Sequence, residues 1–453
     1  MQSANIQHLT RLILIAFVLT AFSLVFWSVL RAEEILARAD NPRQVDAALQ
    51  IQRGQILDRN GRSLAETIST TAGNQRYYPY AQIGPAVGYY SFRHGTAGVE
   101  DSFNAVLRGD HVNEWTTVWR QLLHQPQVGQ AIKLTLDAEI QMQAESLMQG
   151  HKGALILFSQ SGAAADVVSL VSHPGYDPNQ LQEQFDALLA DEDAPLLNRS
   201  TQGQYQPGMV LQPFILAAAY EAGFLQLDEA VKYPNRPVLV NGSATYCASA
   251  VQEPASWRDA LTHRCPGPML DLPDTLSLAD LAEGFNRFRL TQQPALPLNT
   301  ETATYPPVAD EMLAVIGQDN LIVTPLQVAV AWLALHNNGR FPPLRLVSAV
   351  QNEDDTWETV AETTGESETA VSPQTARAIL GALPRTNGIT EFSTRVLSGP
   401  DASINSWYLG ATASGQTLVI VLEDEADLGE IEEIGRALLT AVAIMSANKV
   451  TSN

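Results

Sequence analysis

The run NRSTQGQYQPGMVLQPFILAAAYEAG at residues 198–223 decides the fold of this chain. Its second half, QPFILAAAYEAG at 212–223, is apolar on nearly every side and ends in Gly223, a pattern typical of a buried helix closed by glycine. A Pro-Gly turn at 207–208 stands just before that helix. Because a helix that is apolar all round lies inside a protein, other elements must cover it.

Strand-like runs stand on both sides of this helix. GALILF (153–158) and DVVSLVS (166–172), separated by a Ser-Gly turn, predict a β-hairpin. Three further strand-like runs and one run with helical spacing lie near the C-terminus: RVLSG (395–399), SINSWYLGAT (403–412), QTLVIVLED (416–424) and EIEEIGRALLTAVAIM (430–445). Strands at both ends of a region, with helices between them, predict an α+β sandwich.

The chain upstream of this region has a different composition. Gly and Pro punctuate residues 31–135, which favours strands and turns in a small β-rich domain. Asp137 is placed to cap a helix, so we expect a larger domain at 136–447, followed by a short tail at 448–453. The acidic run 352–370 within the larger domain is typical of a solvated loop or hairpin.

The segment LILIAFVLTAFSLVFWSVL at residues 12–30 contains no charged side chain and is long enough to cross a hydrocarbon core of about 30 Å. We interpret it as a transmembrane helix, with residues 1–11 as a cytoplasmic tail. A cleaved signal peptide is the alternative, but its apolar region ends in small residues, whereas Trp27, Leu30 and Arg31 stand at this exit. Since no second span of similar length follows, we expect a single-pass protein with nearly all of its mass on one side of the membrane.

Composition excludes several classes of function. The 453 residues carry 27 basic and 49 acidic side chains, a formal net charge of -22, and such a surface repels nucleic acid. A hydrophobic share of 45% excludes a disordered or fibrous protein. The histidines show no pair at metal-ligand spacing, and Cys247 and Cys265 are the only cysteines. We therefore expect neither a metal site nor a cofactor.

Several distinctive runs follow one another along the chain: RGQILDRNGRSLAET (53–67), GYYSFRHGTAGVEDSFNAVLRG (88–109), LTLDAEIQMQAE (134–145), SHPGYDPN (172–179), NRSTQGQYQPG (198–208), IGQDNLIVTPLQVAVAWLALHNNG (316–339) and SWYLGA (406–411). In content and order this series resembles the class B penicillin-binding proteins, the membrane-anchored peptidoglycan transpeptidases of bacteria. The resemblance implies a pedestal or dimerisation-like domain at 31–135 and a transpeptidase-like sandwich, similar to serine β-lactamases, at 136–447. It also implies that both lie outside the cytoplasm.

The resemblance places a nucleophilic serine directly after the Pro-Gly turn and a lysine three residues later. At that spacing both side chains share one helix face, so the lysine can accept the serine proton. In this sequence Met209 takes the place of the serine and Gln212 that of the lysine. A thioether has no proton to lose, and a neutral carboxamide is no base at any useful pH. We expect the covalent mechanism to be absent.

The second motif of the family, Ser-x-Asn, corresponds best to Arg264, Cys265 and Pro266 in the run DALTHRCPGP (259–268). A hydroxyl that relays protons is lost in this alignment.

The third motif, Lys-Thr-Gly followed by Thr or Ser, corresponds to Ser398, Gly399, Pro400 and Asp401, before SWYLGA. An aspartate there would repel the substrate carboxylate by roughly 4 kcal/mol at 4 Å. All three motifs are thus degenerate.

Three other side chains are candidates to replace the lost groups. His263 stands beside Arg264, and Ser200 and Thr201 precede the Pro-Gly turn, but a lone histidine in a loop is more often structural and no base is paired with either hydroxyl. Met209, with neighbours such as Leu211 and Phe214, is expected to fill the former cleft with apolar side chains.

The two cysteines lie in a region that we expect to be exported. An oxidising compartment favours a disulfide between Cys247 and Cys265 over two buried free thiols.

These observations predict a catalytically inactive transpeptidase homologue that acts by binding in peptidoglycan synthesis, cell elongation or division. The resemblance implies the membrane, a polytopic glycan polymerase and other cell-wall proteins as partners. One alternative is an active D,D-transpeptidase or carboxypeptidase with relocated residues. Another is a sensor of peptidoglycan peptides that keeps the cleft as a groove.

Overall fold

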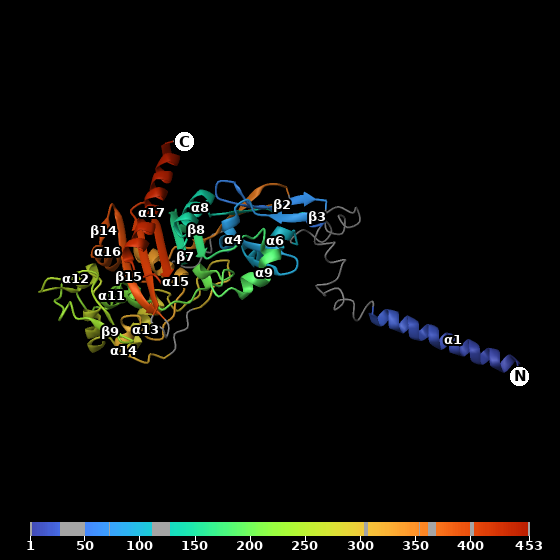
Figure 1. Ribbon diagram of the computed structural model, residues 1–453, viewed down its shortest axis with the longest axis horizontal. Coiled ribbons are helices and arrows are strands. Elements are labelled where there is room, and N and C mark those ends of the chain that lie inside the picture. Colours follow the sequence, from blue (N-terminus) through green and yellow to red (C-terminus); the bar gives the residue numbers. More distant parts are fainter. Residues whose placement is uncertain are drawn as a thin grey trace.

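The computed structural model describes residues 2–27, 50–71, 73–110, 127–302, 307–352, 354–360, 368–398 and 403–451. Two β-sheets organise this part of the chain, one near each end of the body in Figure 1.

The larger sheet, the central sheet, has seven strands in the order β11-β8-β7-β17-β16-β15-β14. Its strands are β7 (Lys152–Ser161), β8 (Ala164–His173), β11 (Leu344–Arg345), β14 (Arg385–Thr386), β15 (Ile389–Ser398), β16 (Ser403–Thr412) and β17 (Gln416–Glu423). The β7–β8 hairpin pairs with β17 in antiparallel register, with Leu155 opposite Ile420. The predicted hairpin and the predicted α+β sandwich are both confirmed, because strands from the two ends of the region meet in one sheet.

Helices cover both faces of the central sheet (Figure 1). On one face α8 (Ala138–Leu147) and α17 (Leu428–Thr451) pack on the sheet through an apolar cluster that includes Ile140, Tyr408 and Leu438. On the other face α15 (Pro325–His336) contacts β7 and β17. The remaining helices of this region are α9 (Leu181–Ala190), α10 (Arg199–Gln202), η3 (Gly208–Leu211), α11 (Gln212–Glu221), α12 (Trp257–Thr262), η4 (Gly267–Asp274), α13 (Leu278–Arg287), α14 (Glu311–Ala314) and α16 (Pro373–Leu380).

Helix α11 is the buried helix predicted from the sequence. It runs from Gln212 to Glu221, and Gly223 follows with a left-handed φ of 80°. Seven of its side chains are buried, and it contacts α13 and α16. Its N-terminal end lies against β15 through η3.

The smaller sheet, called the pedestal sheet here, has six strands in the order β13-β12-β6-β1-β2-β3. Its strands are β1 (Ile56–Leu57), β2 (Ser63–Thr70), β3 (Gly73–Tyr77), β6 (Ile132–Leu134), β12 (Val347–Gln351) and β13 (Trp357–Thr359). Nearby are η2 (Ala81–Ile83), α4 (Gly84–Val87), β4 (Gly88–Ser91), β5 (Gly95–Gly98), α5 (Val99–Ser102) and α6 (Asn104–Arg108). Strand β12 pairs with β6, with Val350 opposite Ile132. Part of the acidic run 352–370 therefore forms a hairpin that completes a sheet whose first strand, β1, begins at Ile56.

A buried ion triad holds the pedestal region together. Glu100 is fully buried in α5, and its carboxylate lies 2.6 Å from the Nη2 of Arg53 and 2.5 Å from the Nε of Arg76. The guanidinium of Arg53 also lies over the ring of Tyr90. Since a single buried carboxylate ties two distant segments together, the triad fixes how β3 and the chain entering β1 pack on α5.

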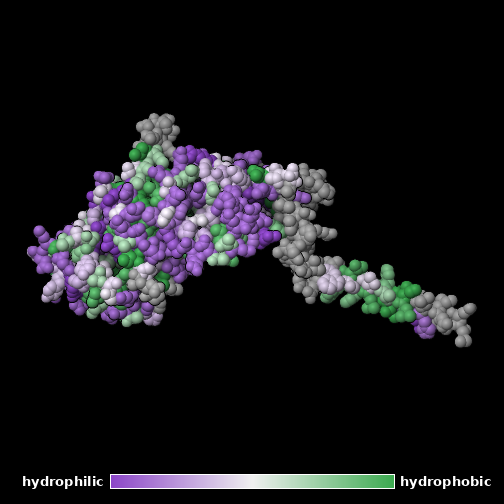
Figure 2. All heavy atoms as spheres, in the orientation of Figure 1, coloured by the Kyte–Doolittle hydropathy of each residue, from purple (hydrophilic) through white to green (hydrophobic). Residues whose placement is uncertain are grey.

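Helix α1 (Gln2–Val25) precedes these regions and overlaps the predicted span 12–30, whose last three residues lie outside the described ranges. Figure 2 colours much of it as apolar, and side chains such as Phe17 (74% exposed) and Phe22 (69%) face outward. Within the described ranges, no helix reaches both the length and the apolarity that a membrane crossing demands.

Candidate functional site

The Pro-Gly turn positions Met209 against the central sheet. Gly208 adopts a left-handed φ of 53°, and a Cβ added there would meet Val396 of β15 at 2.6 Å. Its backbone N–H donates to the carbonyl of Gly317 at 2.8 Å. Only glycine fits this close approach, which brings Met209, 4% exposed, beside the middle of β15.

Gln212 lies one helical turn further on and is 1% exposed. Its Nε2 donates to the backbone carbonyls of Cys265 at 3.1 Å and Ala260 at 3.4 Å. The side chain therefore ties α11 to the end of α12 by donating hydrogen bonds. In both contacts Gln212 acts as a donor and not as a proton acceptor.

Arg264 follows α12 and adopts a left-handed φ of 56°. Its Nη1 donates to the hydroxyl of Ser393 on β15 at 2.9 Å and lies 3.8 Å from a carboxylate oxygen of Glu432 on α17. Burial lowers the pKa of Arg264, and the charge of Glu432 partly offsets this effect. Pro266, two residues later, precedes η4.

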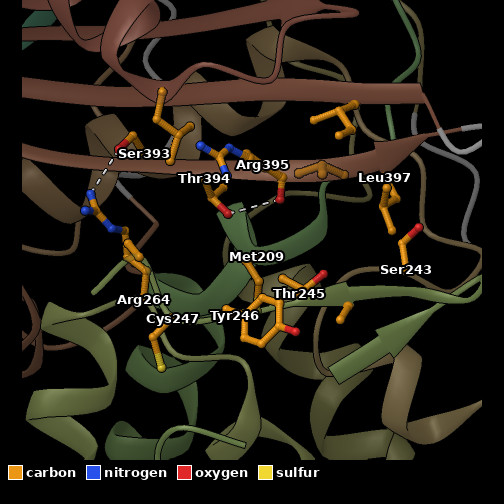
Figure 3. A pocket seen from close by; sticks show the side chains of 15 residues that line it. Met209, Ser243, Thr245, Tyr246, Cys247, Arg264, Ser393, Thr394, Arg395 and Leu397 are labelled. Atoms are coloured by element: carbon orange, nitrogen blue, oxygen red, sulfur yellow. Dashed lines mark hydrogen bonds between the residues drawn. The ribbon is translucent and has the colours of Figure 1, made fainter. Parts of the chain in front are cut away.

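These elements enclose a cavity of about 310 Å³ beside Met209, called the cleft cavity here. One wall is β15 from Ser393 to Leu397, and the other is the segment 243–248, which includes β10 (Ser243–Thr245) and follows β9 (Val238–Val240) (Figure 3). Its lining residues are Met209, Ser243, Ala244, Thr245, Tyr246, Cys247, Ala248, Arg264, Ser393, Thr394, Arg395, Val396, Leu397, Ile404 and Leu428. The expectation of an apolar plug is wrong, because hydroxyl and guanidinium groups line a cavity that stays open.

Of the four residues aligned with the third motif, only Ser398 lies within the described ranges, and it does not line the cleft cavity. Ser398 lines a separate depression with Arg199, Tyr205 and Glu423, and residues 399–401, which include Gly399, Pro400 and Asp401, lie outside the described ranges. The strand positions beside Met209 are instead Ser393 to Leu397. In the pairing of β15 with β16, Thr394 stands opposite Trp407 of SWYLGA, and the wall of the cavity begins at Ser393, upstream of Ser398.

The comparisons with known families agree with this fold. Residues 161–388 match the family described as "Penicillin binding protein transpeptidase domain", and residues 53–132 match "Penicillin binding protein A dimerisation domain". The first match covers half of the chain. The chain belongs to the penicillin-binding protein transpeptidase family.

Curated relatives extend over most of the chain. It is 28% identical to the peptidoglycan D,D-transpeptidase PbpA of Mycolicibacterium smegmatis over 424 residues, which cover 86% of this chain and 84% of the relative. It is 25% identical to PbpA of Mycobacterium tuberculosis, with 94% of each chain covered. Identity to the D,D-transpeptidase MrdA of Escherichia coli K12 is 25%, over 62% of this chain and 53% of MrdA.

Solved structures have the same fold. The imipenem acyl-enzyme complex of penicillin-binding protein A from M. tuberculosis aligns with a TM-score of 0.79 at 24% identity, over 88% of this chain and 99% of that one. The crystal structure of PBPA from M. tuberculosis aligns with a TM-score of 0.76, over 86% and 99%. Homology to transpeptidases of the penicillin-binding protein family thus covers both the pedestal sheet and the central sheet.

In this penicillin-binding-protein homologue, no lysine, histidine, aspartate or glutamate lines the described part of the cleft cavity. Its two cations are arginines, Arg264 and Arg395, and a guanidinium does not lose its proton in proteins. The carboxylate of Glu432 on α17 accepts a hydrogen bond from the hydroxyl of Ser393, which lines the cavity. That carboxylate is already held by Arg436 at 2.9 Å and by Arg264.

The three substitute residues considered from sequence lie away from the cleft cavity. Ser200 is fully buried and donates to the carbonyl of Val171, and Thr201 is 1% exposed. The Nδ1 of His263 shares a hydrogen bond of 2.7 Å with the hydroxyl of Ser249. None of the three lines the cavity beside Met209.

The disulfide joins one wall of the cavity to the turn that carries Arg264. Cys247 and Cys265 are bonded at an S–S distance of 2.06 Å. Cys247 lies in the wall segment 243–248, and Cys265 is fully buried directly after Arg264. Across the described ranges, no group of three His, Cys, Asp or Glu side chains could hold a metal ion.

The sequence did not reveal the residues that form the two walls. Ser393 and Thr394 were missed because neither belongs to a Lys-Thr-Gly pattern, although two adjacent hydroxyl residues in a strand beside SWYLGA were a usable signal. The segment 243–248 gave no signal, since it reaches the cavity through the disulfide and the short β9–β10 hairpin.

Proposed function

We propose that this chain is a catalytically inactive, membrane-anchored member of the transpeptidase family that acts by binding within peptidoglycan synthesis. The observation that carries the proposal is the pair Met209 and Gln212. Met209 occupies the place of the nucleophile, and the amide of Gln212 donates to two carbonyls at the place of the base. A thioether and a donating amide cannot form an acyl-enzyme.

The anchor is supported by the apolar surface of α1. Uncharged side chains from Leu12 to Trp27 are exposed in the isolated chain, and residues 28–30 extend the uncharged run. Such a continuous apolar surface is stable only when lipid or protein covers it. We propose a single-pass anchor that places residue 32 and everything after it outside the cytoplasm.

The partners follow from the family resemblance. We propose a polytopic glycan polymerase and other cell-wall proteins of elongation or division, contacted through the anchor and the region around the pedestal sheet. Cross-linked pull-down from membranes tests this, with a variant whose residues 12–30 are replaced by an unrelated span as the comparison.

Labelling with a fluorescent penicillin tests inactivity. We expect no covalent label on the full-length chain at a concentration that labels PbpA of M. tuberculosis, the relative solved as a penicillin G acyl-enzyme complex. Stoichiometric labelling would instead establish an active enzyme with relocated residues. Mass spectrometry of the labelled peptide would then identify the nucleophile, and Ser393, beside Glu432, is the first hydroxyl to examine.

Topology is tested separately by protease treatment of intact spheroplasts. We expect digestion of the region after residue 32 without opening the cytoplasm. Digestion only after the cytoplasm is opened would reverse the proposed orientation.

A second candidate function, recognition of peptidoglycan peptide, is favoured by the cleft cavity. Its volume of about 310 Å³ and its hydroxyl and guanidinium lining suit a short polar peptide better than an apolar ligand. Isothermal titration with a synthetic stem peptide tests it. Binding that is lost in Arg395→Gln and retained in Arg258→Gln, an exposed arginine outside the cavity, would support recognition.

A further inference from the structure

Arg264 connects two walls of the cleft cavity within the region of the central sheet. It belongs to the turn after α12 on the helical side of the cleft cavity, and its guanidinium reaches the hydroxyl of Ser393 on β15 (Figure 3). Glu432 on α17 accepts from the same hydroxyl and lies 3.8 Å from the same guanidinium. One side chain therefore spans the end of the cavity and joins the turn to the central sheet and to α17.

The backbone at Arg264 is held in place by its surroundings. A left-handed φ of 56° is uncommon for arginine and persists only where neighbouring contacts impose it. The N–H of Cys265 donates to the carbonyl of Ala260 at 2.8 Å, and the disulfide fixes the same residue from the side of Cys247. The disulfide therefore restrains Cys265, the residue that directly follows Arg264.

The wall segment 243–248 depends on the same turn. Besides the disulfide, the N–H of Ala248 donates to the carbonyl of His263 at 2.9 Å. Most of this segment is exposed, and Cys247 itself is only partly buried and lines the cavity. A small dithiol can reach the bond from that side.

We propose that Arg264 is a latch that keeps the cleft cavity closed at one end, and that reduction of the disulfide between Cys247 and Cys265 releases it. In the reduction, a dithiol gives two electrons and two protons to the bond: each cysteine sulfur becomes a thiol, and the dithiol becomes a disulfide. Without the bond, the turn at Arg264 relaxes, the contact with Ser393 is lost, and the wall segment moves away from Met209.

Met209 is a built-in probe of this opening. Its thioether is 4% exposed beside the cavity, and hydrogen peroxide converts exposed methionine to the sulfoxide. Met148, fully buried in the cluster under α8 and α17, reports global loosening, and Met312, 57% exposed, reports the activity of the oxidant. Peptide mass spectrometry of the purified full-length chain gives the three oxidation rates together.

Arg264→Asn removes the latch while keeping a residue that tolerates a left-handed φ. The rate of Met209 oxidation should rise about tenfold, the size expected for loss of one charge-assisted hydrogen bond, with Met148 unchanged. Ser393→Ala, which removes the partner on β15, should raise it in the same way. Arg258→Gln, which breaks an exposed pair with Asp228 on the same helix α12, is the matched control and should leave the rate unchanged.

Reduction completes the test. Treatment with dithiothreitol, followed by alkylation of the two thiols and removal of the reagent before peroxide is added, should raise the rate of Met209 oxidation several-fold in the wild type and add little in Arg264→Asn. The double change Cys247→Ser with Cys265→Ser should do the same. An unchanged rate in both Arg264→Asn and Ser393→Ala would overturn the latch, as would an equal rise at Met148 in both variants. A wild-type rate that dithiothreitol leaves unchanged would overturn the redox control.

Discussion

The amide nitrogen of Gln212 lies 3.1 Å from the backbone carbonyl oxygen of Cys265, at the helix position that the family resemblance assigns to the base. The side chain has become part of the connection between α11 and α12. The proposed loss of catalysis would therefore be accompanied by a structural role for Gln212. Simple reversion then has to disturb that connection.

We predict that Met209→Ser combined with Gln212→Lys does not restore acylation. The lysine would replace a buried amide, and its ammonium would donate to the carbonyls of Ala260 and Cys265 as Gln212 does now. In the alignment with the family, Arg264 also takes the place of the hydroxyl of the second motif. Fluorescent penicillin is the measurement, with Gln212→Lys alone as the control, and clear stoichiometric labelling would mean that the site was only recently disabled.

The same double variant should be less stable. A hydroxyl replaces the buried thioether of Met209, and an amine enters a site that is 1% exposed, so we expect a loss of about 1–3 kcal/mol in the free energy of unfolding. Urea denaturation gives the value. An unchanged free energy would contradict the structural role assigned to Gln212.

Gly208→Ala should destabilise the fold around the candidate site. The new Cβ would lie 2.6 Å from the side chain of Val396. The alanine would also have to adopt a left-handed φ of 53°, which is unfavourable for a residue with a Cβ. Gly162→Ala is the matched control, since Gly162 has a φ of 65° with open space around it. We expect about 1 kcal/mol for the control and about 1–3 kcal/mol more for Gly208→Ala by thermal or urea unfolding. Equal losses of stability in Gly208→Ala and Gly162→Ala would mean that β15 shifts to accommodate the methyl group.

Glu100→Gln should loosen the pedestal region. The change leaves two buried arginines, Arg53 and Arg76, without their carboxylate, at a cost of about 3–5 kcal/mol. Glu139→Gln, which removes an exposed partner of Arg62, is the control and should cost less than about 0.5 kcal/mol. Hydrogen exchange of the pedestal sheet measures the difference, and equal protection in both variants would argue against the triad.

The triad also predicts a dependence on pH. Burial raises the pKa of Glu100, but Arg76 and Arg53 outweigh it, so the pKa in the folded chain is lowered. The folded state thus binds fewer protons, and the stability from this group is complete above the pKa of an unfolded glutamate, about 4.3, and falls as the pH drops below it. Unfolding followed from pH 7 to pH 3 should lose stability more steeply in the wild type than in Glu100→Gln.

Thiol titration tests the disulfide. Under denaturing, non-reducing conditions we expect no titratable thiol, because the only two cysteines are joined. Opening a loop of 18 residues should cost about 3 kcal/mol. Two reactive thiols before reduction would contradict the bond.

Sequence reasoning succeeded where a pattern is local. The helix from Gln212 and the hairpin at 153–172 follow from apolar runs, a Pro-Gly turn and a Ser-Gly turn, all within a few residues of one another. It failed where contacts are distant in the chain. The cleft cavity that Met209 lines is also lined by Ser393 and not by Ser398, and no local pattern in the sequence encodes this placement.

The cleft cavity was missed for a related reason. Met209 and its apolar neighbours indicate a filled core, and they are indeed buried. The polar wall opposite comes from Thr245 and nearby residues, brought there by a disulfide and a short hairpin. The apolar residues that follow Met209 in the sequence therefore could not predict that the opposite wall of the cavity is polar.

The hairpin of β12 and β13, which pairs with the edge of β6, constrains the order in which parts of this protein can fold during synthesis. The first four strands of the pedestal sheet, β3, β2, β1 and β6, end at Leu134, but the neighbour of β6 is not synthesised until residues 347–351. The backbone N–H and C=O groups along one edge of β6 therefore stay unpaired during synthesis until β12 has been made, by which point more than half of the chain that follows β6 has been synthesised. A ribosome-bound or partly exported intermediate that ends before residue 347 should carry an open edge for chaperones to protect, and the N-terminal region cannot mature as a separate unit ahead of the rest.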